Sequence, residues 1–161
     1  MATLTESVLV QASLAETWGY YFEPSGWPAW VDGFNAVESA SGYPDEGGTL
    51  VWRSTRAGRG TVRERVLAHE PRKLHRIAFE DPESSGELTT RFAVEGESTR
   101  VTLELTYALA GSGVFAWLTE RLFVRSQVAK SLLRTLARFR LEAEELAELN
   151  AAAASSPPAD R

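Results

Sequence analysis

The stretch that decides the fold is residues 114–149, which read VFAWLTERLFVRSQVAKSLLRTLARFRLEAEELAEL. Within it, one set of side chains recurs at steps of three and four residues: Leu118, Leu122, Arg125, Ala129, Leu132, Leu136, Phe139 and Ala143. This spacing places the set on one face of a long amphipathic helix. Because the stripe includes a cation, Arg125, and a small residue, Ala129, we expect it to fill the interior imperfectly and to leave a cavity.

The residues before this helix predict strands with two short helices near the start. Residues 3–10 alternate as a strand, and Ser13 and Glu16 form a capping-box pattern that starts a short helix near Leu14. Prolines and glycines then interrupt the chain, and the tryptophans at 27 and 30 suggest a second short helical turn. Six further strands are expected at residues 35–40, 49–55, 61–69, 73–79, 87–94 and 100–109.

Short turns separate the six later strands, which favours an antiparallel meander over parallel crossovers. Alternation is clearest in the last two strands, where one face carries Leu88, Thr90, Phe92, Val94, Val101, Leu103, Leu105 and Tyr107. We therefore predict an α+β fold in which about seven antiparallel strands have one covered face and one wet face. The long helix has no second long helix to pair with, so its stripe must lie across the covered face.

The bulk composition fits one globular domain, which we place at residues 1–150. The chain has 161 residues, 43% hydrophobic, with a formal net charge of -5 and no cysteine. The lack of cysteine excludes disulfides, thiolate zinc sites and cysteine nucleophiles. The acidic balance argues against nucleic-acid binding. Residues 151–161 are small and polar, and we expect a disordered tail there.

No targeting or membrane-spanning segment is apparent in the sequence. The N-terminus lacks the basic and apolar regions of a signal peptide, and no segment approaches the roughly 20 apolar residues of a membrane span. We therefore expect a cytoplasmic protein. The sequence leaves the oligomeric state open.

Three short motifs accompany this order of elements: Ala15-Glu16-Thr17-Trp18, Trp27-Pro28-Ala29-Trp30 and Glu70-Pro71. With them, residues 3–148 resemble the START/Bet v1-like (SRPBCC) superfamily, and more specifically its polyketide cyclase/dehydrase-like group. The resemblance implies a helix-grip fold, in which a curved antiparallel sheet wraps around the C-terminal helix and encloses a pocket for an apolar or aromatic small molecule. It implies no shared catalytic motif, and many members of the group only bind or carry a ligand.

Residue types that commonly carry chemistry are sparse. The two histidines, His69 and His75, are six residues apart across a turn, so they cannot form a helical two-histidine zinc site. We expect no metal and no cofactor. No nucleophile elbow or phosphate-binding glycine pattern is present, and Gly58-Arg59-Gly60 is typical of a hairpin turn. His75 shares parity with inward-facing residues, which is compatible with a cavity position or with an ordinary core histidine.

Two charged residues fall where apolar residues are expected. Glu64 lies between Val62 and Val66 on one strand face, and Arg125 interrupts the helix stripe. A buried carboxylate must be protonated, meet a cation or meet a ligand, and Arg125 could supply the cation. The alternatives are that Glu64 lies at a sheet edge and that Arg125 extends to solvent.

Aromatic residues supply the remaining candidates for the pocket, because ligand cavities are mostly apolar with a few polar groups. The predicted lining is Trp27, Trp30, Trp52, Glu64, His75, Phe79, Phe92, Leu103, Tyr107, Arg125 and Ala129. Two function classes stay open. The first is a protein that binds or carries a hydrophobic or aromatic small molecule. The second is a cofactor-independent cyclase, aromatase or dehydratase that uses Glu64, Tyr107 or Arg125, and the sequence favours binding because no acid/base pair has a specific spacing.

Overall fold

The computed structural model describes residues 1–110 and 117–157, and within the last helix it describes side chains from Phe123 onward. The elements follow in the order β1 (Ala2–Val10), α1 (Leu14–Tyr21), η1 (Pro24–Gly26), α2 (Trp27–Trp30), β2 (Phe34–Ser41), β3 (Thr49–Ser54), β4 (Thr61–Glu70), β5 (Leu74–Glu80), β6 (Ser84–Glu95), β7 (Ser98–Leu109) and α3 (Trp117–Ser155).

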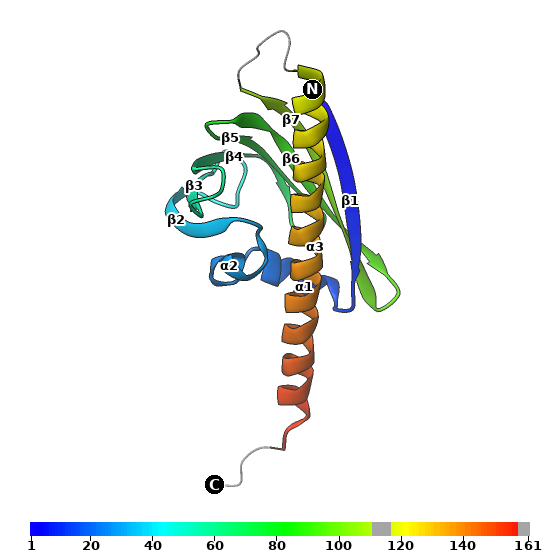
Figure 1. The fold of residues 1–161 in the computed structure, drawn as a ribbon. Coiled ribbons are helices and arrows are strands. Elements are labelled where there is room, and N and C mark those ends of the chain that lie inside the picture. The colour runs from blue at the N-terminus through cyan, green and yellow to red at the C-terminus, as the bar shows by residue number, and fades with distance from the viewer. Residues whose placement is uncertain (111–116, 158–161) are drawn as a thin grey trace.

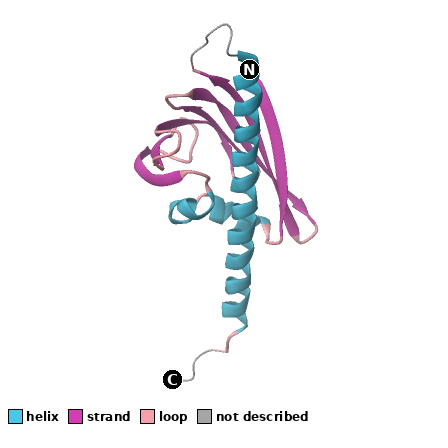
Figure 2. Ribbon diagram, in the orientation of Figure 1, coloured by secondary structure: helices cyan, strands magenta, loops and turns pink. Residues whose placement is uncertain are grey.

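The strands form one antiparallel sheet of seven strands in the order β1-β7-β6-β5-β4-β3-β2. Strands β2 to β7 are a meander joined by short turns, and β1 adds to the free edge of β7. The sheet curves, and α3 runs along its concave side (Figure 1). The short helices α1 and α2 lie on the same side, near the end of the sheet away from the start of α3 (Figures 1 and 2). The predicted helix-grip fold is therefore confirmed.

The register of the central strands gives the concave face its apolar character. Leu88 lies opposite Leu105, and Phe92 lies opposite Val101. Val101 and the alternate residues that follow it on β7 are buried, whereas Glu104 between them is exposed. The predicted alternation of a covered and a wet face is observed.

The start of α1 is fixed by the predicted capping box. The backbone N–H of Glu16 donates to Ser13 Oγ at 3.2 Å, and the Glu16 carboxylate accepts from the Ser13 backbone N–H at 3.2 Å. These two bonds satisfy donors that a helix start leaves free. The helix therefore begins at Leu14, as predicted, and its aromatic residues follow at fixed positions over the sheet.

The C-terminal helix is longer than expected. We predicted an end at Leu149 and a disordered tail from residue 151, but α3 continues to Ser155. The extra turn consists of Ala151 to Ala154, and alanine has the highest intrinsic helix propensity. The predicted start at Val114 and the side chains of Leu118 and Leu122 lie outside the described residues.

The C-terminal half of the predicted stripe forms the centre of the core. Leu136, Phe139 and Ala143 are buried and belong to one hydrophobic cluster with Val101 and Leu103. The helix packs most closely against β1, α1 and α2. It thus lies towards one side of the concave face and leaves space over the middle of the sheet.

Leu136→Ala should lower the free energy of unfolding by about 2–5 kcal/mol, because it removes buried methyl groups and leaves a void. Leu133→Ala is the matched control, since Leu133 is 48% exposed on the same helix and its replacement should cost less than about 0.5 kcal/mol. Chemical denaturation of both variants measures the difference. Equal losses would contradict the assigned inner face of α3.

Candidate ligand-binding cavity

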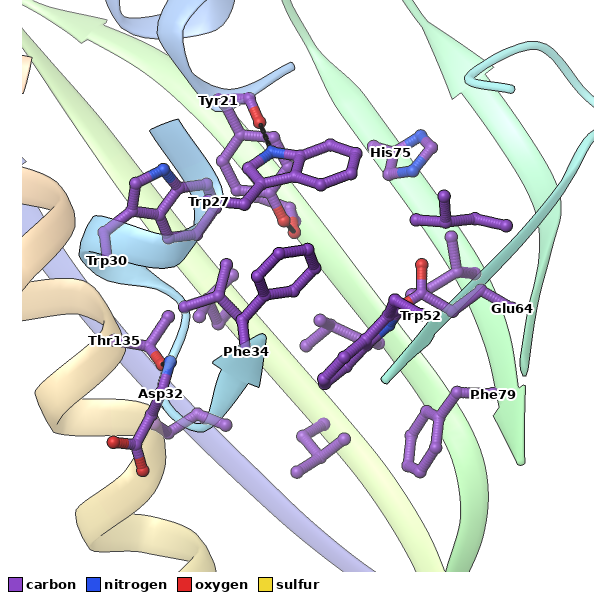
Figure 3. A pocket seen from close by; sticks show the side chains of 18 of the residues that line it. Tyr21, Trp27, Trp30, Asp32, Phe34, Trp52, Glu64, His75, Phe79 and Thr135 are labelled. Carbon is purple, nitrogen blue, oxygen red and sulfur yellow. Dashed lines mark hydrogen bonds between the residues drawn. The ribbon is translucent and has the colours of Figure 1, made fainter. Parts of the chain in front are cut away.

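A cavity of about 160 Å³ lies between the concave face of the sheet, α2 and α3. Its lining is mostly aromatic and aliphatic (Figure 3). Six of its lining residues also line a larger groove of about 580 Å³: Asp32, Arg59, Phe79, Leu105, Ser131 and Leu132. The cavity therefore continues into the groove beside α3.

Aromatic rings from α2 and the start of β2 close one side of the cavity. Trp27 and Trp30 are 5% and 4% exposed, and the ring of Phe34 packs against that of Trp52 with centroids 5.3 Å apart. The indole Nε1 of Trp27 donates to the Tyr21 carbonyl at 2.9 Å, which fixes the plane of that ring (Figure 3). The short helix α2 thus serves to place two large rings over the sheet.

Glu64 is the buried carboxyl group of the cavity. Its neighbours across the sheet are Leu50 on β3 and Phe79 on β5. The nearest residues on the same face of β4 are two buried valines, Val62 and Val66. Trp52, diagonal to it, donates its Nε1–H to Glu64 Oε1 at 2.7 Å. Part of the residue keeps some exposure, but the carboxyl group itself lies in the interior.

These surroundings change the acidity of Glu64. Burial raises its pKa from 4.5 to about 7, although the Trp52 hydrogen bond and the charge of Arg59 act in the opposite direction. The carboxyl group is therefore partly protonated at neutral pH. It can donate or accept a proton within the cavity.

Arg59 lies where the cavity meets the groove. Its Nε donates to Asp81 Oδ2 at 2.5 Å, and its guanidinium carbon lies 4.7 Å from the centroid of the Phe79 ring. Asp81 is itself held by the backbone N–H groups of Glu83 and Ser84 at 2.9 and 2.7 Å. Although burial raises the pKa of Asp81, the charge of Arg59 and these bonds outweigh it and hold that pKa below its usual value.

Asp32, just after α2, attaches the aromatic side of the cavity to α3. Its carboxylate accepts from Ser131 Oγ at 2.7 Å and from Arg134 Nη2 at 2.8 Å, and its backbone N–H donates to Thr135 Oγ1 at 3.0 Å. The hydrogen bond from Arg134 is the main reason why the pKa of Asp32 is lowered. This attachment positions Trp30 against Phe139, with ring centroids 4.8 Å apart.

A pair of histidines lies at the edge of the cavity near α1. His75 on β5 is 2% exposed and lines the cavity, and its Nδ1 is 3.0 Å from Nδ1 of His69 on β4. Burial, and then the neighbouring His69, lower the pKa of His75 to about 4. His75 is therefore neutral at physiological pH.

Seven of the eleven predicted lining residues surround the cavity: Trp27, Trp30, Trp52, Glu64, His75, Phe79 and Leu103. The other four do not. Phe92 is buried behind the cavity wall against Trp18, with ring centroids 4.9 Å apart, and Tyr107 is buried and lines the groove instead. Arg125 is exposed and Ala129 is half-buried, and neither lines the cavity.

Arg125 and Ala129 were misplaced because a second face of α3 has the same spacing. Val124, Val128, Ser131 and Thr135 also recur at steps of four, three and four, and these half-buried residues line the groove or the cavity together with Leu132 of the predicted stripe. Two members of this second face are hydroxyl residues, so an apolar pattern does not select it. Arg125 does not face the cavity and so does not partner Glu64, and Arg59 provides the nearby positive charge instead.

Several of the cavity residues that the sequence did not predict come from loops and element ends. They include Tyr21, Asp32, Tyr43 and Arg59. Arg59 stands in the Gly58-Arg59-Gly60 turn, where Gly60 has a positive φ of 74° and donates its N–H to Ser54 Oγ at 2.8 Å. The turn was predicted correctly, but the direction of its central side chain depends on the tertiary structure.

Among the described residues, no group of three or more His, Cys, Asp and Glu side chains is placed to hold a metal ion. In the same part of the chain, no helix has the length and apolar character needed to cross a membrane.

A curved antiparallel sheet that grips one long helix around a cavity defines the helix-grip class of ligand-binding folds. The sequence matches the family model described as "Polyketide cyclase / dehydrase and lipid transport" over residues 1–144. The chain therefore belongs to this family, and the predicted resemblance is confirmed. No curated protein sequence matches it.

Several solved structures share the fold. The Zhui aromatase/cyclase from Streptomyces sp. R1128 has a TM-score of 0.74 at 16% identity, and the match covers 97% of this chain and 99% of that one. The di-domain ARO/CYC StfQ from the steffimycin biosynthetic pathway has a TM-score of 0.71 at 14% identity, with 91% and 51% covered. A protein of Thermus thermophilus has a TM-score of 0.67 at 20% identity, with 96% and 100% covered. At these identities the likeness establishes the fold alone.

The raised pKa of Glu64 makes folding stability depend on pH. Below pH 4.5 the carboxyl group is protonated in both states, but between 4.5 and about 7 it ionises only in the unfolded chain, so a rising pH favours unfolding. At about 1.4 kcal/mol per pH unit, up to about 3 kcal/mol is lost by pH 8. Glu64→Gln avoids this loss, because it is neutral and keeps an acceptor for Trp52 Nε1.

The stability of Glu64→Gln relative to the wild type should therefore rise by up to about 3 kcal/mol between pH 4.5 and pH 8. Urea denaturation at several pH values measures it. Glu104→Gln, on the exposed face of β7, is the matched control and should show no such trend. A constant difference for Glu64→Gln would mean that this carboxyl group is solvated.

Proposed function

We propose that this protein binds an apolar, ring-containing small molecule, with one ring in the cavity and the remainder in the groove beside α3. The observation that carries the proposal is the cavity itself: it has a volume of about 160 Å³, Trp27, Trp30, Phe34 and Trp52 are among the residues that line it, and a buried carboxyl group lies in its wall. A cavity of about 150 Å³ lined by apolar side chains accommodates benzene. Its size therefore suits a single ring.

Charge supports the same ligand class. The charged groups at the cavity mouth, Arg59 and Asp32, are already paired with Asp81 and Arg134. The groups inside, Glu64 and His75, are wholly or partly neutral at pH 7. A neutral ring would enter such a cavity without leaving a charge unpaired, whereas an ion would have to be desolvated.

Membership of a family described by cyclase, dehydrase and lipid-transport activities supports a hydrophobic ligand. It leaves open whether the ligand is also converted. A cytoplasmic location and the absence of nucleic-acid binding stay predictions from the sequence.

Leu132→Trp should fill the cavity and weaken binding of toluene, the single-ring probe, at least tenfold, because Leu132 lines it from α3. Ala129→Trp is the matched control: it adds more volume to the same helix, at a position that does not line the cavity, and should leave toluene affinity within about twofold. Isothermal titration calorimetry measures both affinities. Thermal denaturation checks folding, since overpacking costs about 1–3 kcal/mol.

Equal toluene affinity in the wild type and Leu132→Trp would contradict the proposed binding site. Native mass spectrometry of the protein purified without added ligand is the complementary experiment. A co-purified ring compound that Leu132→Trp fails to retain would identify the natural ligand class.

One observation favours a second candidate, proton-transfer catalysis of the cyclase or dehydratase type. A carboxyl group with a pKa of about 7 in an apolar cavity suits a general acid or base at neutral pH. For such an enzyme, Glu64→Gln would bind the co-purified compound with little change but convert it at least a hundredfold more slowly. Binding without conversion in the wild type would exclude this candidate for that compound.

A further inference from the structure

His75 has one ring nitrogen whose hydrogen-bonding capacity is unused. Its Nδ1 faces His69, but its Nε2 is fully buried and has no hydrogen-bond partner among the residues that the structure describes. A buried polar atom without a partner costs free energy comparable to a lost hydrogen bond. Since His75 lines the cavity, a molecule bound there supplies the missing bond when the side chains packed over Nε2 move aside to admit its oxygen atom.

The position of His69 depends on an irregularity in β4. Val62, Glu64 and Val66 face inward at every second residue, and a β-bulge between Val66 and Ala68 then shifts the register. After the shift His69 lies directly opposite His75, whereas strict alternation would have turned it to the other face. Bulges commonly redirect a side chain near a functional site.

Aromatic rings fix the planes of both imidazoles. The rings of Phe22 and Tyr43 meet His75 edge-on at 4.9 and 5.5 Å between centroids, and Trp18 covers His69 at 5.3 Å. The pair is therefore held in one geometry. Neither ring can turn Nε2 of His75 towards another partner without losing these contacts.

The contact between the two Nδ1 atoms couples the tautomer of His75 to that of His69. Only one of them carries the hydrogen of that bond. If His75 carries it, its Nε2 has a free lone pair and accepts a bond. If His69 carries it, neutral His75 holds its hydrogen on Nε2 and donates a bond.

We infer that His75 Nε2 binds an oxygen substituent, a hydroxyl or a carbonyl, on the ring held in the cavity, and that His69 adjusts His75 to whichever of the two is present. The inference rests on the proposed function and narrows its ligand class to oxygen-substituted rings. Within that class, a hydroxyl selects the tautomer with hydrogen on His75 Nδ1. A carbonyl selects the one with hydrogen on His75 Nε2.

Phenol and toluene are the probes that test this inference, because they are similar in size and differ by a hydroxyl in place of a methyl group. In the wild type, phenol should shift the ¹⁵N resonance of His75 Nε2 towards the value of a bonded acceptor, and toluene should leave it nearly unchanged. This measurement needs no variant. A resonance that responds equally to both probes would overturn the inference.

Affinities give the second test. His75→Leu keeps the side-chain volume but offers no partner for the hydroxyl, so the ratio of phenol to toluene affinity should fall about tenfold, the equivalent of one lost hydrogen bond to a buried group. Arg76→Leu is the matched control on the same strand, since Arg76 is exposed on the outer face, and should leave the ratio unchanged.

The outcomes separate the two proposals. If toluene binds the wild type but His75→Leu keeps the same ratio, the histidine site is wrong and the ring-binding cavity stands. If neither probe binds the wild type, both proposals fail. If both probes bind the wild type, and the ratio of phenol to toluene affinity falls in His75→Leu but not in Arg76→Leu, both proposals are supported.

Discussion

One α-helix cannot cover the concave face of a seven-stranded sheet, and most of this structure follows from that mismatch. Strands spaced about 4.8 Å apart make a sheet about 30 Å wide, whereas a helix with its side chains is about 10 Å wide. Helix α3 lies beside β1, so the middle of the sheet must be covered by other means. The rings of α1, α2 and β2 cover part of it, and the space that they leave is the cavity.

The polar groups around this space differ in whether an opposite charge is paired with them. At the mouth, Arg59 pairs with Asp81 and Asp32 pairs with Arg134, and these ion pairs attach a turn and α2 to the rest of the fold. Among the described residues, Glu64 and His75 have no such ion pair, and burial raises the pKa of Glu64 to about 7 and lowers that of His75 to about 4, so at pH 7 the carboxyl group is partly neutral and the histidine is neutral. The side chain of Asp81 is fully buried and stays charged because Arg59 pairs with it, whereas a buried group without such an ion pair changes its protonation instead. This arrangement supports the proposed neutral ligand, and it leaves Glu64 able to exchange a proton.

The fold was predictable because each element leaves a local pattern: a capping box at Ser13, alternation along β6 and β7, and short turns between strands. Glu64 was predictable as well, because it breaks an apolar strand face. The exposed position of Arg125 was not predictable, since two faces of α3 share the same spacing and only packing decides which of them turns to the interior. The role of Arg59 in the cavity and the bulge that turns His69 inward depend on tertiary structure and leave no such pattern in the sequence.

The central claim is that a ring-sized, apolar cavity encloses the Glu64 carboxyl group. The most direct measurement is a ¹³C NMR pH titration of that carboxyl group, with and without toluene. The account predicts a midpoint near pH 7 that moves higher when toluene displaces water from the cavity, because desolvation disfavours the charged form. A midpoint near pH 4.5 that toluene does not change would contradict it.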